Sequence, residues 1–223
     1  MDGRKSVSAI VPVFNEEKTV SRVIDSLLKS SLIDEVICIN DGSSDTSIDI
    51  LNQYKDKIKI VNLRKNHGKG FALSIGIQQA KGEIIAFIDA DLTNLSDDHI
   101  RELLTPILTG ETRGVVGYPS SVKGKIFNPL SSFAGERAYY KKDLISHVEE
   151  IEKTRFGVEV FLNHLFEKKE IKKVPLNNLK GLFKHEKRGP VNTIAEYHGE
   201  VSEIIKEVIR QRSFLKIVKV SDS

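Results

Sequence analysis

The sequence predicts an α/β protein whose mostly parallel central sheet carries helices on both faces. Three observations support this class. Short apolar runs alternate with helical segments over the first hundred residues, about four such units fit into that length, and a polar or glycine-containing turn follows each run. A chain of 223 residues fits one large domain of this kind. We therefore expect one domain over residues 1–223.

The first strand, Val7–Val13, opens this alternation. Asn15 follows it and is a suitable N-cap for a helix that we expect to run to about Lys29, with acidic residues favoured in its first turn. Further strands are expected at Glu35–Asn40, Ile58–Leu63 and Ile84–Ile88, and the helices between them should end near Tyr54 and Ala80.

The pattern is less regular in the second half of the chain. We expect strands near Gly114–Tyr118 and Ile171–Pro175, and helices over Ser131–Ser146, from about Gly157 to Lys168 and over Val191–Arg212. The last of these is amphipathic, which favours packing or dimer formation. Residues 119–130 and 176–190 read as loops, and the second loop is basic.

Composition and hydropathy argue against a membrane-spanning protein. Hydrophobic residues make up 39% and charged residues 29% of the chain, as in ordinary globular proteins, and there is no apolar run of about 18 residues that could span a membrane. No signal peptide is recognisable at the N-terminus, and Cys38 reads as a core residue, so we expect a cytoplasmic protein. Residues 112–223 hold 21 Lys/Arg against 14 Asp/Glu, which suggests an anionic partner.

Asp89-Ala90-Asp91 is the most informative motif. It directly follows a buried strand, so both carboxylates should lie beyond the carboxyl end of the sheet, where open α/β sheets bind ligands. Two close carboxylates repel each other unless a cation lies near them, and hard oxygen ligands suit Mg²⁺ or Mn²⁺. The alternative is a helix-capping Asp beside a surface Asp.

Three further polar segments follow the other strands of the same sheet. They are Pro12-Val13-Phe14-Asn15-Glu16, Asn40-Asp41-Gly42-Ser43-Ser44-Asp45 and Asn66-His67-Gly68-Lys69-Gly70. Each alone could be a simple turn or cap. Because the ends of parallel strands meet at one edge, four such segments together favour a shared ligand site.

This ordered set resembles the family 2 type glycosyltransferases with the GT-A fold, the nucleotide-diphospho-sugar transferase type. The resemblance implies a nucleotide-sugar-binding half over residues 1–112, an acceptor half over 113–190 and a C-terminal helix and tail over 191–223. It also implies a donor pocket, with Glu16 near the ribose, Asp41 near the base and Lys69 near the diphosphate. The residues implied for this pocket are Pro12, Val13, Asn15, Glu16, Asp41, Lys69, Asp89 and Ala90. Mg²⁺ or Mn²⁺ would be held by Asp91, with Asp89 close by.

A looser resemblance covers residues 130–188. Gly135-Glu136-Arg137-Ala138 is similar to acceptor segments of polyprenyl-phosphate sugar transferases and of glucosyl-3-phosphoglycerate synthases, which implies acceptor binding by Gly135, Arg137 and Arg188. The resemblance also implies catalytic roles for Glu159, Asp91 and Arg137, and a metal ligand at His185. Structural alternatives are an ion pair for Arg137, a helix-start acid for Glu159 and a surface position for His185.

The sequence therefore predicts a metal-dependent transferase that moves a hexose from a UDP- or GDP-sugar to a phosphorylated acceptor. 3-Phosphoglycerate and a polyprenyl phosphate both fit, and the stereochemical outcome stays open. The alternatives are a non-catalytic sugar-nucleotide-binding protein and a sugar-phosphate nucleotidyltransferase, although the latter should carry a glycine- and arginine-rich loop after the first strand. Peripheral membrane association and a homodimer are compatible with the sequence, and no nucleic-acid-binding pattern is present.

Overall fold

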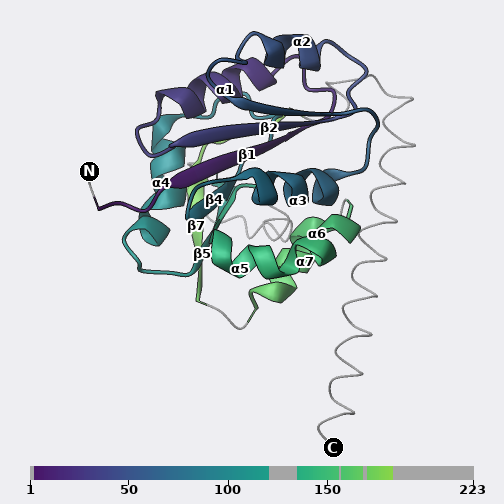
Figure 1. Cartoon of the computed structure of the whole chain (residues 1–223). Helices are drawn as coiled ribbons and strands as arrows, with labels where there is room; N and C mark the ends of the chain where they lie inside the picture. Colours follow the sequence, from purple (N-terminus) through teal and green to yellow (C-terminus); the bar gives the residue numbers. More distant parts are fainter. Residues whose placement is uncertain (1–2, 121–134, 156, 168–169, 183–223) are drawn as a thin grey trace, which may run out of the picture.

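The computed structural model describes residues 3–120, 135–155, 157–167 and 170–182. In these residues a seven-stranded sheet has the order β3-β2-β1-β4-β6-β5-β7, and helices cover both of its faces (Figure 1). The strands are β1 (Val7–Val13), β2 (Glu35–Asp41), β3 (Lys59–Leu63), β4 (Ile84–Phe87), β5 (Gly114–Ser120), β6 (Arg137–Tyr140) and β7 (Ile171–Asn177). The predicted mixed α/β class with a mostly parallel sheet is confirmed.

The helices are short and connect successive strands. They are α1 (Val20–Lys29), α2 (Ser47–Asn52), α3 (Lys69–Gln79), α4 (Asp97–Leu108), α5 (Lys141–Leu144), α6 (Val148–Lys153) and α7 (Val158–Leu165), with a 3₁₀ turn at Ile145–His147. No helix in the described ranges is both long and apolar enough to cross a membrane.

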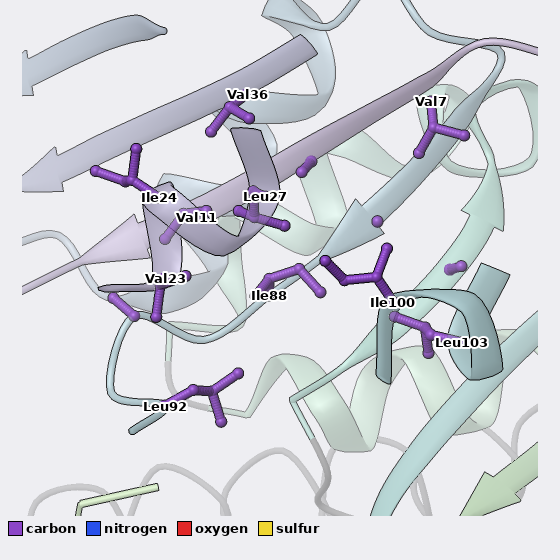
Figure 2. Close-up of a cluster of buried hydrophobic side chains, with 14 of the residues drawn as sticks. Val7, Val11, Val23, Ile24, Leu27, Val36, Ile88, Leu92, Ile100 and Leu103 are labelled. Atoms are coloured by element: carbon purple, nitrogen blue, oxygen red, sulfur yellow. The ribbon is translucent and has the colours of Figure 1, made fainter. Parts of the chain in front are cut away.

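Two hydrophobic layers hold the sheet between its helices. On one face, α1 and α4 bury Leu27 and Leu103 against alternate residues of β1 such as Val11, as Figure 2 shows for the cluster around Ile88. On the other face, α3, α6 and α7 pack against Ile10 and Phe87. This alternation is the two-residue period of a strand that is buried on both sides.

One strand runs against the others. β6 pairs antiparallel with β4, with Arg137 opposite Phe87, and antiparallel with β5. We expected a helix over Ser131–Ser146, and this prediction is wrong for Arg137–Tyr140. Because β6 is antiparallel, its first residue lies at the edge where β4 ends, which brings residues 135–137 to the Asp89 loop.

Two other expectations about helices are corrected. α1 begins at Val20, so Asn15 is not its N-cap. Asn15 instead has a φ of 58° and belongs to a loop. The helix α4 was not predicted at all, although Ser96 and His99 form a capping box at its start. The expected helix at Val191–Arg212 lies outside the described residues.

Candidate functional site

The carboxyl edge of the sheet gathers the loops that follow β1, β2, β3 and β4. The loop after β1 is fastened to the loop after β2 by Asn15. Its Oδ1 accepts hydrogen bonds from the backbone N–H of Ser44 (2.7 Å) and Asp45 (3.2 Å), and its own N–H donates to Ser43 Oγ (2.9 Å). The left-handed backbone at Asn15 is one that Asn tolerates better than most residues.

Pro12, Val13 and Glu16 flank this connection. Val13 is fully buried, and Pro12 is paired with Ile39 of β2. The Glu16 N–H donates to Ser47 Oγ at 2.8 Å. The Glu16 bond ties the loop after β1 to the first residue of α2.

Asp41 holds the glycine-containing turn after β3 in place. Its Oδ1 accepts from the N–H of His67 and its Oδ2 from the N–H of Gly68, both at 2.8 Å. Burial raises the pKa of Asp41, against the lowering effect of the two N–H bonds and of the positive charges of His67 and Arg155. In this structure the carboxylate positions a loop next to the site.

Gly68 is the N-cap of α3 and has a φ of 99°, in a region that disfavours residues with a Cβ. A Cβ at this position would lie 3.0 Å from the Cβ of Arg155, and the Gly70 N–H donates to the Arg155 carbonyl at 2.6 Å. Arg155 itself is in a left-handed conformation, with a φ of 50°. The loop between α6 and α7 is therefore docked on the amino end of α3.

Lys69, the first residue of α3, joins the two halves of the site. Its Nζ lies 2.6 Å from Asp89 Oδ1 and 2.7 Å from Glu159 Oε1 of α7. Burial alone would lower the pKa of Lys69, but the charges of Asp89 and Glu159 outweigh it and raise the pKa above the ordinary lysine value. The ammonium is therefore a fixed positive charge at the carboxyl edge of the sheet.

Gly135 and Glu136, which directly precede β6, lie close to Asp89. A Cβ on Gly135 would overlap the Asp89 carboxylate, so only glycine fits there without displacing the acid. Glu136 is 4% exposed, and burial followed by the charge of Asp89 raises its pKa to about 8. Sequence reasoning assigned no role to Glu136, because its burial depends on the strands with which β6 pairs.

Arg137 is the first residue of β6 and lies opposite Phe87 of β4. It is 1% exposed, and its Nη1 donates to Asn163 Oδ1 of α7 at 2.7 Å and to the Tyr139 hydroxyl at 3.2 Å. The structure therefore places Arg137 in a buried network between β6 and α7. Its predicted catalytic and acceptor roles stay predictions.

The Asp91 segment is paired with the chain that follows β7. The Asp91 carbonyl accepts from the Leu182 N–H (2.9 Å), and the Lys180 carbonyl accepts from the Thr93 N–H (2.8 Å). A Cβ on Gly181 would lie 3.3 Å from Asp91 Oδ1, so this carboxylate lies beside the same segment, and Ala90 is buried behind it. His185 and Arg188 lie outside the described residues.

The oxygen donors here suit a hard divalent ion. Within the described ranges, however, no three Asp, Glu, His or Cys side chains converge closely enough to hold one. Asp89 is engaged by Lys69. An ion bound beside Asp91 would need further ligands from a substrate or from other parts of the chain.

Comparison with known proteins identifies the class of molecule to which this sheet and edge belong. A model described as glycosyl transferase family 2 matches residues 8–156, so the chain belongs to this family. A poly(ribitol-phosphate) beta-glucosyltransferase of Bacillus spizizenii is 39% identical over 92 residues, which are 38% of this chain and 14% of that protein. An undecaprenyl-phosphate 4-deoxy-4-formamido-L-arabinose transferase of Pectobacterium carotovorum is 35% identical over 102 residues, 42% of this chain and 31% of that protein.

Solved structures share the fold. Glucosyl-3-phosphoglycerate synthase from Mycobacterium tuberculosis, in a complex with Mn²⁺, UDP and glucosyl-3-phosphoglycerate, superposes with a TM-score of 0.72 at 24% identity. The match covers 93% of this chain and 80% of that one. The curated relatives above are longer proteins, of which this chain spans less than a third. The predicted membership of family 2 and the GT-A type of fold are confirmed.

Proposed function

We propose that the protein is a glycosyltransferase that moves a hexose from a nucleotide-diphosphate sugar to a phosphorylated acceptor. The observation that carries this proposal is the Lys69 ammonium, held between Asp89 and Glu159 at the start of α3. A fixed positive charge beside a helix N-terminus is suited to a diphosphate. Membership of family 2 supports the same reaction.

The reaction needs charge stabilisation above all, because the departing nucleoside diphosphate becomes more negative as the glycosidic bond breaks. In this proposal Lys69 would donate to that diphosphate. In this proposal Mg²⁺ or Mn²⁺, when bound, supplies further positive charge to the leaving group. Asp91 would be its principal ligand, with His185 and Asp89 as further candidates.

The donor pocket would use the loops that Asn15 and Asp41 hold in place. Pro12 and Glu16 would lie beside the nucleoside, Val13 would support them from the core, and Ala90 would back the carboxylates. The acceptor would approach from β6 and α7, through Gly135, Arg137 and the basic segment that includes Arg188. An acceptor that attacks through a phosphate oxygen is already ionised and needs no strong base, whereas one that attacks through a hydroxyl must lose a proton as the glycosidic bond forms.

Two acceptors fit this chemistry equally at the level of charge. 3-Phosphoglycerate is a small soluble anion, whereas a polyprenyl phosphate would require contact with a membrane surface. An assay of sugar transfer to each acceptor, with the polyprenyl phosphate dissolved in detergent, distinguishes these two possibilities. The non-catalytic alternative predicts donor binding with neither transfer nor hydrolysis, and the nucleotidyltransferase alternative predicts release of pyrophosphate from a nucleoside triphosphate.

The first prediction tests the donor and the metal together. UDP- and GDP-sugars are screened for binding by calorimetry and for slow hydrolysis, with Mn²⁺, with Mg²⁺ and with EDTA. We expect metal-dependent binding of one donor series, and a loss of about 100-fold in hydrolysis for Asp91→Asn, because the ion loses its main carboxylate. Asp56→Asn, at an exposed turn, is the matched control. Absence of binding to every donor, or normal turnover by Asp91→Asn, contradicts the proposal.

A further inference from the structure

Glu159 reaches the donor side of the site from the acceptor side. It lies in the first turn of α7, and its carboxylate accepts from Lys69 at 2.7 Å. The side chains are 13% and 21% exposed, respectively. A charge-assisted bond in such a sheltered place is stronger than one at the open surface.

We propose that Glu159 is a positioning residue for the diphosphate-binding Lys69, and that it does not act as the base of the reaction. The inference rests on the proposed function and names the part that Glu159 plays in it. The Lys69 ammonium occupies Oε1 of Glu159, so a proton from an acceptor would have to go to one of the remaining lone pairs of the carboxylate. The same bond fixes the direction of the Lys69 side chain.

The number of donors on the ammonium supports this role. A lysine ammonium carries three N–H groups. Asp89 and Glu159 each take one, which leaves one for a phosphate oxygen. With only one carboxylate in place, the flexible lysine chain could rotate about that single contact.

The backbone around Glu159 is itself tied to α3. Val158 and Leu162 of α7 are each 1% exposed, so the helix is anchored on the sheet. The bond from the Gly70 N–H to the Arg155 carbonyl joins the loop before α7 to the first turn of α3 at 2.6 Å. The Lys69 and Glu159 backbones are therefore held at a fixed separation, as a positioning contact requires.

A double-mutant cycle tests the inference without turnover. Dissociation constants for UDP and GDP are measured by calorimetry for wild type, Glu159→Gln, Lys69→Met and the double variant, with UMP and GMP as probes that lack the second phosphate. We expect Glu159→Gln to raise the dissociation constants of UDP and GDP roughly tenfold and to leave those of UMP and GMP unchanged. The double variant should bind the diphosphate no more weakly than Lys69→Met. Glu150→Gln, on the exposed face of α6, should match wild type.

Three results would overturn the inference. One is unchanged diphosphate affinity in Glu159→Gln. Another is an additive effect in the double variant. The third is a kcat for Glu159→Gln that falls at constant affinity and loses its dependence on pH, which would identify a base. If wild type itself binds neither nucleotide, the proposed function fails, and that result is distinct from a failure of Glu159→Gln alone.

Discussion

At the scale of single residues, the site depends on the contact between Lys69 and Asp89. Lys69 and Asp89 were predicted from turns that follow strands, and they meet at 2.6 Å. Glu136 was missed because its importance comes from burial, and burial depends on the partners of β6. Asn15 was taken for a helix cap, since its residue type fits both a cap and a left-handed loop position.

Gly135 is the residue with the least freedom to change. In Gly135→Ala the new methyl group would overlap the Asp89 carboxylate, which must then move away from Lys69. We expect a loss of about 1–3 kcal/mol in the free energy of unfolding, measured by urea denaturation, together with weaker nucleotide-diphosphate binding. Gly3→Ala, where a Cβ meets nothing within 4 Å, should change neither, and a stable Gly135→Ala variant with normal binding would contradict the assignment.

At the scale of elements, local patterns identified β1 to β4 almost residue by residue. Each is a short buried run bounded by polar turns, and this signal is contained within the segment itself. The strand β6 was mistaken for a helix because its four residues acquire their identity by pairing with β4, about 50 residues earlier in the chain. Pro106 lies inside α4 and concealed a helix whose apolar spacing was otherwise regular.

The connection between the loops after β1 and β2 can be tested at Asn15. Replacement by Gly removes the bonds to Ser44 and Asp45 but keeps the left-handed backbone accessible, whereas Ala also strains it. We expect Asn15→Ala to be less stable than Asn15→Gly by about 1 kcal/mol in urea unfolding, and both to be less stable than wild type. Asn52→Ala, at the exposed end of α2, is the control. Equal stability of the two Asn15 variants would show that the backbone conformation carries no cost.

At the scale of the whole molecule, burial of Glu136 should make stability depend on pH. Its pKa is about 8 in the folded protein, against an ordinary value of 4.5, so the folded state binds this proton more tightly than the unfolded state. The stabilisation is complete below about pH 4.5 and is lost as the pH rises through about 8.

The matching variant is Glu136→Gln, which stays neutral throughout. We compare the free energies of unfolding of Glu136→Gln and wild type. Between about pH 5 and about pH 8 we expect the difference to change in favour of the variant, by at most about 1.4 kcal/mol per pH unit. Urea unfolding of both proteins in EDTA, without nucleotide, measures this difference. Unfolding free energies that run parallel over the window would contradict the raised pKa.

The contact between Lys69, Asp89 and Glu159 also has a consequence for the history of the sequence. Two negative charges and one positive charge lie together in a sheltered site. The three residues are separated by 20 and 70 positions in the sequence. Loss of the lysine alone would leave two acids close together, and loss of one acid alone would leave the lysine with a single carboxylate contact. Substitutions at these three positions should therefore covary, so that related sequences that differ at one of them also differ at another.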